Sequence, residues 1–175
     1  MIYSDRTMAA LTKLGIAPER VAGRGLCEHP EEDGLVVAET ARDGREFLLT
    51  PAAAQAWNAM RTAAASDGVT LYIISAFRSI ERQVELIERK LAAGETLDSI
   101  LTIIAPPGFS EHHCARAIDI GSPGAPVLDS AFDRTPAFLW LRAHAGAYGF
   151  VLSYPEGNAA GYQYEPWHWC FHAAV

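Results

Sequence analysis

Hydrophobic and polar residues change their spacing along this chain, and each change predicts an element of secondary structure. Short apolar stretches that each include one glutamate occupy 35–39 and 46–49, and their length and composition are typical of β-strands. Asp43-Gly44 lies between these stretches. Because this dipeptide suits the positive φ of a tight turn, the segment predicts a β-hairpin. A run rich in β-branched residues over 69–74 then predicts a strand that is buried on both faces.

Apolar residues spaced three and four apart predict helices, and the polar residues beside them predict where the helices begin. Thr50-Pro51 and Thr135-Pro136 each place a capping hydroxyl before a proline at the first helical position, where the missing N–H is not needed. Ser79 is the expected cap of another helix. The predicted helices cover about 5–14, 51–67, 79–94, 97–103 and 136–149.

Three further strands are predicted at 117–120, 150–153 and 167–171. Glycines, prolines and an acidic run interrupt residues 1–33, which we expect to form a less regular N-terminal extension. No internal repeat or linker divides the sequence, so we expect one domain over 1–175. The fold class is α+β, with a small antiparallel sheet flanked by helices.

Length and charge narrow the class of protein. The chain has 175 residues, half of them hydrophobic, which is enough to bury roughly two thirds of the unfolded surface in one core. The net charge is −7, from 21 acidic and 14 basic side chains, so there is no basic footprint for nucleic acid. The apolar runs are too short and too polar to predict a membrane span.

Cysteine usage and the first residues bear on the compartment. Cys27, Cys114 and Cys170 form no CxxC pair and are odd in number, so a disulfide framework is not expected. No apolar stretch of the kind found in a signal peptide precedes Lys13. We therefore expect a cytoplasmic location for the chain as written, and a periplasmic or extracellular one if an export signal was removed. The sequence carries no pattern that predicts an oligomeric state.

Two stretches that lie far apart in the sequence carry the candidate chemistry. His112 and Asp119 supply an imidazole and a carboxylate across a turn, and His168 supplies a second imidazole. These three ligands leave a fourth coordination position open, which is the arrangement of a catalytic zinc site. Glu165, three residues before His168, is placed to take a proton from a metal-activated water. Together the residues predict a hydrolase with Zn²⁺ as its cofactor.

Glu165 and His168 raise a geometric question. In a regular strand an odd separation would place them on opposite faces. Pro166 between them cannot donate to a strand ladder and fits a bulge or the first strand position. We therefore predict that the last strand starts irregularly there, so that both side chains turn toward the metal.

The same residues carry a family resemblance. A Ser-x-His motif, an Ala-x-Asp motif and a late Glu-Pro-Trp-His, preceded by Ser-Ala-Phe-Arg-Ser at 75–79 and by Gln83, resemble the LAS zinc peptidases. The similarity is greatest to the D-alanyl-D-alanine carboxypeptidases and dipeptidases, and it covers about 48–171. It implies the LAS fold, also described as hedgehog-like or D,D-peptidase-like. It also implies a peptidoglycan-derived peptide or D-Ala-D-Ala as the substrate.

The resemblance assigns roles to five residues. It implies that His112, Asp119 and His168 are the zinc ligands. It implies that Glu165 is the general base and then the acid, and that Arg78 binds the substrate and polarises the scissile carbonyl. Zinc and Arg78 would both face the oxyanion of the tetrahedral intermediate, where one such donor is worth roughly 3 to 4 kcal/mol.

Other positions are open to two interpretations. Arg78 is alternatively a helix-start residue that forms an ion pair with Glu81 or Glu85. Ser110 either contacts the terminal carboxylate of the substrate or caps its own loop. Trp167 either contacts the substrate or lies in the core or at its rim. Candidate substrate-binding residues are Ser110, Gln83, Tyr164 and Trp167.

The sequence departs from the family pattern at Cys114-Ala115, where Thr-Gly is expected. If the glycine of the family pattern adopts a positive φ, alanine at position 115 is strained by about 1 kcal/mol. One hypothesis is that the Cys114 thiolate approaches the zinc, and the alternative is that it points into the core. A second site formed by His168, Cys170 and His172 on one strand face is a weaker alternative, because these positions lie too far apart along the strand. The remaining histidines, His29, His113 and His144, are interpreted as non-ligands.

These inferences favour a zinc-dependent D-alanyl-D-alanine carboxypeptidase that hydrolyses the terminal D-Ala-D-Ala bond of peptidoglycan stem peptides. The alternatives are a D-Ala-D-Ala dipeptidase, a peptidoglycan endopeptidase, and a binding module that keeps the LAS fold without turnover. Glu165 separates the enzymes from the binding module, because a module that only binds has no need of a base at that position.

Overall fold

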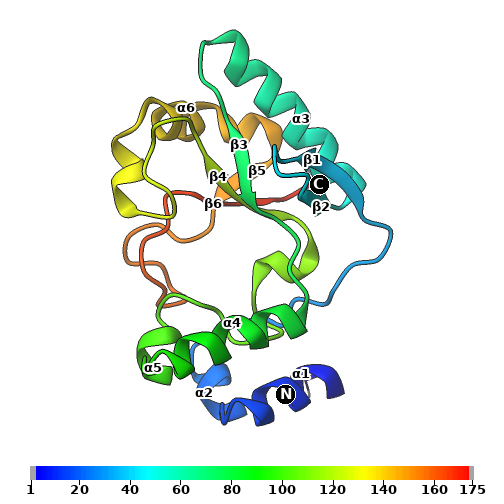
Figure 1. Ribbon diagram of the computed structural model, residues 1–175, viewed down its shortest axis with the longest axis vertical. Coiled ribbons are helices and arrows are strands. Elements are labelled where there is room, and N and C mark those ends of the chain that lie inside the picture. The colour runs from blue at the N-terminus through cyan, green and yellow to red at the C-terminus, as the bar shows by residue number, and fades with distance from the viewer. Residues whose placement is uncertain (1–2, 174–175) are drawn as a thin grey trace.

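A four-stranded antiparallel sheet with the strand order β3-β4-β6-β5 lies at the centre of the molecule (Figure 1). The computed structural model describes residues 3–173. A separate two-stranded hairpin, β1-β2, lies beside it, and helices cover the sheet, which confirms the predicted α+β class. The strands are β1 (Val36–Thr40), β2 (Glu46–Leu49), β3 (Tyr72–Ser75), β4 (Ala117–Gly121), β5 (Phe150–Leu152) and β6 (His168–Phe171). The helices are α1 (Asp5–Lys13), α2 (Pro18–Gly23), α3 (Pro51–Ser66), α4 (Ile80–Ala92), α5 (Leu97–Ile100) and α6 (Pro136–His144).

Local sequence signals place most of these elements correctly. Gly44 has a φ of 83° in the turn between β1 and β2, as the hairpin prediction requires. Thr50 caps α3 by accepting a hydrogen bond from the N–H of Ala53, and Ser79 and Thr135 cap α4 and α6 in the same way. Prediction and structure therefore agree where a side chain bonds to its own neighbouring backbone.

The strand predicted at 69–74 differs from expectation. β3 begins only at Tyr72, and of its four residues only Ile73 is buried. β3 is an edge strand, paired with β4 on one side only. The prediction that it is buried on both faces was wrong, because periodicity does not reveal a strand's position in its sheet.

Two hydrophobic cores flank the middle of the molecule. The larger one joins α3 and α6 to the inner face of the sheet, with Trp57, Leu141 and Ile118 fully buried. The smaller one joins α1 and α2 to α4 and α5, which lie together at the opposite end in Figure 1. Residues 3–33 are thus more regular than predicted, since they contain both α1 and α2 and bury apolar side chains against α4.

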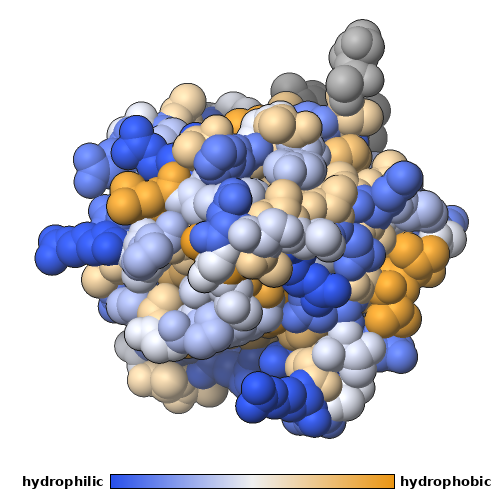
Figure 2. All heavy atoms as spheres, turned by 90° about the horizontal axis from the view of Figure 1, so that it is seen from above, coloured by the Kyte–Doolittle hydropathy of each residue, from blue (hydrophilic) through white to orange (hydrophobic). Residues whose placement is uncertain are grey.

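The outer surface is mixed in character. Figure 2, which views the molecule from the end opposite α1, shows hydrophilic and hydrophobic residues interspersed, with the apolar side chains in small separate groups. Such scattered groups are ordinary for a protein surface. Within residues 3–173, no helix combines the length and the apolar character needed to cross a membrane.

Candidate metal centre

The first candidate ligand, His112, lies on a 3₁₀ turn that spans Glu111–Cys114 and leads into β4. Ser110 caps this turn, since its hydroxyl accepts a hydrogen bond from the His112 N–H at 3.4 Å. Ala115 ends the turn with a φ of 50°, in the left-handed region. This is the position where a glycine was expected, and the predicted strain of about 1 kcal/mol applies to it.

The other two candidate ligands, Asp119 and His168, lie on neighbouring strands of the sheet. Asp119 in β4 pairs with His168 at the start of β6, and both side chains are buried. The two neighbours of Asp119 in the strand, Ile118 and Ile120, point into the larger core, as predicted. The alternation of β4 therefore turns Asp119 to the face that carries the site.

Glu165 and His168 are joined by a tight turn rather than by a regular strand. The His168 N–H donates to the Glu165 carbonyl at 3.1 Å, and β6 begins only at His168. The intervening Pro166-Trp167 stays outside β6, although the Trp167 carbonyl still accepts from Ile120 at 2.9 Å. The predicted irregular start is confirmed. Its result is that Glu165 Oε2 lies 3.9 Å from His168 Nδ1.

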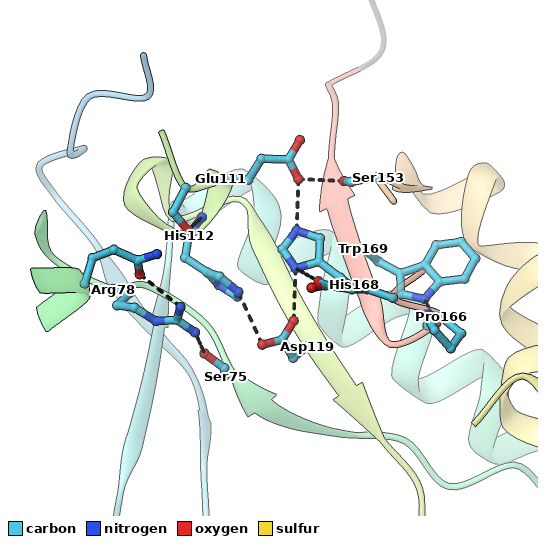
Figure 3. A network of polar contacts seen from close by, with 12 residues as sticks. Ser75, Arg78, Glu111, His112, Asp119, Ser153, Pro166, His168 and Trp169 are labelled. Carbon is cyan, nitrogen blue, oxygen red and sulfur yellow. Dashed lines mark hydrogen bonds and ion pairs between the residues drawn. The ribbon is translucent and has the colours of Figure 1, made fainter. Parts of the chain in front are cut away.

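His112, Asp119 and His168 converge on one point (Figure 3). Each offers a ligand atom, and these atoms lie within 4.8 Å of one another. Asp119 Oδ1 is 3.0 Å from His168 Nδ1, and Asp119 Oδ2 is 3.3 Å from His112 Nε2. All three residues are buried, and His112 Nδ1 has no hydrogen-bond partner among the described residues. Two imidazole nitrogens and one carboxylate form a donor set that fits zinc.

Two carboxylates, those of Asp119 and Glu111, control the protonation of His168. Burial alone would lower the pKa of His168, but hydrogen bonds to Asp119 and Glu111 overcome it and raise that pKa to about 10. Burial alone would raise the pKa of Asp119. The neighbouring His112 and His168 overcome this effect and hold that pKa well below its usual range. Without a metal, His168 is therefore protonated at neutral pH and bonds to two ionised carboxylates, those of Asp119 and Glu111.

Glu111 is a component of the site that sequence reasoning missed. Its Oε2 lies 2.9 Å from His168 Nε2 and accepts a hydrogen bond from the Ser153 hydroxyl at 2.6 Å (Figure 3). Burial would raise the pKa of Glu111, but His168 and Ser153 together lower it to about 2. A carboxylate on the outer nitrogen of a ligand histidine fixes the ring and makes it a stronger ligand. Only the adjacency of Glu111 to His112 hinted at this role, because Ser153 is 42 residues away.

Glu165 has the electrostatic properties of a base that works near neutral pH. Burial raises its pKa to about 7, and the negative charge of Asp119 adds to this effect, while His168 and Arg78 oppose it. General bases are most effective when their pKa lies near the working pH.

Arg78 follows β3 and faces the same space. Its Nη1 donates to Gln83 Oε1 at 3.1 Å and its Nη2 donates to Ser75 Oγ at 3.0 Å. The alternative prediction of an ion pair with Glu81 or Glu85 was wrong: these carboxylates pair with Arg6 and Arg82.

The backbone of Arg78 is held by the turn that carries His112. The Arg78 N–H donates to the His112 carbonyl at 3.2 Å, and the Arg78 carbonyl accepts from His113 Nδ1 at 2.5 Å. His113 Nε2 accepts in turn from the Gly108 N–H at 3.1 Å. His113, as predicted, is not among the grouped metal ligands. Both of its nitrogens are bonded to the backbone.

The candidate ligands open onto a cleft of about 410 Å³. Ser110, Gln83 and Trp167 line it, as predicted, and Gln83 is fixed there by donating to the Ala105 carbonyl at 2.7 Å. Tyr164 does not line it but packs against the larger core, so that prediction was wrong. The cleft wall includes, besides these, Arg78, Leu86, Lys90, Ile103, Ile104, Leu128, Tyr154, Tyr162, Gln163 and Glu165.

The cysteines lie outside this centre. The three thiols are free, and Cys114 is buried with its thiol donating to the Glu111 carbonyl at 2.9 Å. The hypothesis that Cys114 approaches the metal was wrong, and the alternative of a buried core thiol holds. Cys170 is also buried, and His172 is exposed. Across residues 3–173, His112, Asp119 and His168 form the one group of three or more such ligands.

Comparisons with known proteins agree with this geometry. A family model described as VanY, D-alanyl-D-alanine carboxypeptidase, matches residues 46–174. The chain is 35% identical over 120 residues to a putative carboxypeptidase, YodJ, of Bacillus subtilis (strain 168). This alignment covers 66% of this chain and 43% of that protein. It is 33% identical over 118 residues to a D-alanyl-D-alanine carboxypeptidase of Enterococcus faecium, with 66% and 34% covered. The chain thus spans less than half the length of these two relatives.

Solved structures show the same fold. The LD-carboxypeptidase LdcB superposes with a TM-score of 0.72 at 30% identity, over 81% of this chain and 69% of that one. A vancomycin resistance D,D-pentapeptidase, VanY, in complex with Zn(II) superposes with a TM-score of 0.64 at 26% identity, over 80% and 79%. The predicted LAS-type fold is therefore confirmed.

Proposed function

Because the chain belongs to the VanY family of D-alanyl-D-alanine carboxypeptidases, we propose that it is a zinc-dependent enzyme that removes the terminal D-alanine from peptidoglycan stem peptides. One observation carries the proposal: a buried group of two imidazoles and one carboxylate opens onto a cleft beside Glu165 and Arg78. The VanY structure that contains Zn(II) supports the choice of metal.

His112, Asp119 and His168 would hold the zinc. When bound, zinc supplies a Lewis acid that polarises a carbonyl group and lowers the pKa of water. Glu111 keeps the His168 ring turned so that Nδ1 faces Asp119. The three ligands are thus oriented by the fold before a metal arrives, which reduces the reorganisation that binding requires.

Glu165 moves the proton. It accepts a proton from the attacking water as the new carbon–oxygen bond forms, and it delivers that proton to the amine of D-alanine as the carbon–nitrogen bond breaks. Its pKa of about 7 suits both directions of transfer. Burial keeps it in a poorly solvated space beside His168, where charge interactions are strong.

Arg78 would bind the carbonyl oxygen that becomes negatively charged. Hydrogen bonds to Gln83 and Ser75 fix its guanidinium, so the positive charge is already in place when the oxyanion forms. Ser110 lines the same cleft and would contact the terminal carboxylate of the substrate.

A second candidate function is supported by the comparisons. LdcB is described as an LD-carboxypeptidase, and an L,D-carboxypeptidase, DacB of Streptococcus pneumoniae, superposes with a TM-score of 0.58 at 27% identity. The same machinery would then cleave D-alanine from a residue of L configuration. The two functions differ in the stereochemistry that the cleft accepts on the amino side of the bond.

Release of D-alanine from a panel of peptides tests these functions. The panel holds a pentapeptide that ends in D-Ala-D-Ala, a tetrapeptide whose last bond joins an L centre to D-Ala, and the bare dipeptide, each with zinc or with a chelator. We expect chelator-sensitive release from the pentapeptide. Release from the tetrapeptide alone would identify an L,D-carboxypeptidase, and release from the dipeptide alone a dipeptidase. No release by the zinc-loaded protein would overturn the carboxypeptidase proposal in favour of an endopeptidase or a binding module.

A further inference from the structure

Arg24 connects the N-terminal part of the chain to the cleft, although it lies before the family-matched residues. It follows α2, and its Nε and Nη2 both donate to the Ala160 carbonyl, at 3.1 and 2.7 Å. Its Nη1 donates to the Leu101 carbonyl at 2.8 Å. One guanidinium therefore binds two backbone carbonyls, from segments 136 and 77 residues further along the chain.

The same guanidinium lies over the ring of Tyr162, at 4.4 Å from its centroid. Tyr162 is 8% exposed and lines the cleft. Its ring meets that of Tyr154 edge-on at 4.9 Å, and the Tyr154 ring lies 4.7 Å from that of His168. A continuous series of contacts thus runs from Arg24 to a candidate metal ligand.

The segment that Arg24 holds has few other anchors. Residues 155–164 contain no helix or strand, and Gly157 and Gly161 both have a φ of 70°. Asn158 bonds only within the segment, to Pro155 and Tyr162. Two further anchors to the rest of the fold are the bond from the Gln163 N–H to the Thr102 carbonyl at 2.9 Å and the packing of Tyr164 against the larger core. Segments with so few buried contacts open easily unless something fixes them.

We propose that Arg24 is a positioning residue of the cleft, which holds residues 155–164 so that Tyr154, Tyr162 and Gln163 form its wall. The planar guanidinium is needed because it donates to two carbonyls and stacks on a ring at once, which an ammonium group cannot do. The N-terminal segment would therefore support the substrate site without lining it. Only the kinetic consequence rests on the proposed function.

Hydrogen exchange of the zinc-loaded full chain tests the structural step. In Arg24→Ala, amide exchange in a peptide covering 155–165 is expected to be about tenfold faster or more, because charge-assisted bonds to two carbonyls are lost. Arg24→Lys should show an intermediate rate. Arg20→Ala is the matched control: Arg20 lies in α2 and pairs with the exposed Asp98 rather than with residues 155–164. Exchange of 155–165 at the parent rate in Arg24→Ala would overturn the proposal.

Kinetics test the functional step on whichever peptide the parent cleaves. We expect about a tenfold higher KM in Arg24→Ala with kcat changed less than about threefold, equal zinc content, and parent values in Arg20→Ala. An unchanged KM, or an equal loss in Arg20→Ala, would show that Arg24 only stabilises the fold and would refute the role in the cleft. If Arg24→Ala does not fold, Arg24→Lys serves for the same comparison. A parent without turnover would refute the proposed function, while hydrogen exchange would still decide whether Arg24 orders the wall.

Discussion

Zinc binding should release about one proton from His168, and the structure sets the size of this effect. Hydrogen bonds to Asp119 and Glu111 overcome burial and raise the His168 pKa to about 10, yet a ligand nitrogen must be free of its proton. At pH 7, which is about three units below that pKa, zinc has to displace the proton from His168. At about 1.4 kcal/mol per unit, proton competition weakens zinc binding by roughly 4 kcal/mol, or about a thousandfold.

The assay is calorimetry of zinc binding at pH 8 in buffers of different ionisation enthalpy, which gives the number of protons released. At this pH Glu165 is mostly ionised, because its pKa is about 7, so the released protons come from His168 and from the water that zinc acidifies. We expect at least one proton per zinc, and a zinc affinity that rises roughly tenfold or more per pH unit.

Glu111→Gln should release fewer protons, because His168 loses the charge on its Nε2 side. Glu85→Gln is the matched control, since this exposed carboxylate pairs with Arg82. It should behave as the parent does. Release of less than about 0.3 proton by the parent at pH 8 would refute the reasoning, since His168 would then already be neutral without the metal.

Three other substitutions separate binding, chemistry and folding. Glu165→Gln should retain zinc but lose about 10²- to 10⁴-fold in kcat, measured by D-alanine release, because the proton-transferring group is gone; parent-like turnover would remove Glu165 from the mechanism. Glu165→Gln should also weaken the pH dependence of the free energy of unfolding of the metal-free protein. Burial raises the Glu165 pKa from 4.5 to about 7, so its favourable contribution is complete below pH 4.5 and is lost as the pH rises through 7, by up to about 3 kcal/mol in denaturant unfolding. His168→Ala should lose stoichiometric zinc in metal analysis after desalting, and retained zinc would contradict its role as a ligand. Ala115→Gly should raise the free energy of unfolding by about 1 kcal/mol, because φ is 50° there; a lower value would mean that the lost methyl contact matters more.

Sequence predicted the parts of this molecule that depend on neighbouring residues. The caps of α3, α4 and α6 follow from side chains that bond to the adjacent backbone, and the β1-β2 turn follows from the positive φ of Gly44. Pro166 likewise indicated the irregular start of β6. The grouping of His112, Asp119 and His168 came from motif residues whose spacing suits a metal site, and the structure brings those three side chains together.

What the sequence did not predict depends on contacts between distant segments. Glu111 gains its position from Ser153 and His168, and neither partner is marked by local spacing. Tyr162 rather than Tyr164 lines the cleft because Arg24 holds that ring from a different part of the chain. Periodicity reports which side of an element is apolar, but not which other element it meets.

The most direct test of the zinc centre is D-alanine release from the D-Ala-D-Ala pentapeptide while metal-free protein is titrated with zinc. A single catalytic ion held by His112, Asp119 and His168 predicts activity that rises in proportion to zinc up to one equivalent and then stays constant. Full activity in the presence of a chelator, or no activity at one bound equivalent, would contradict the account.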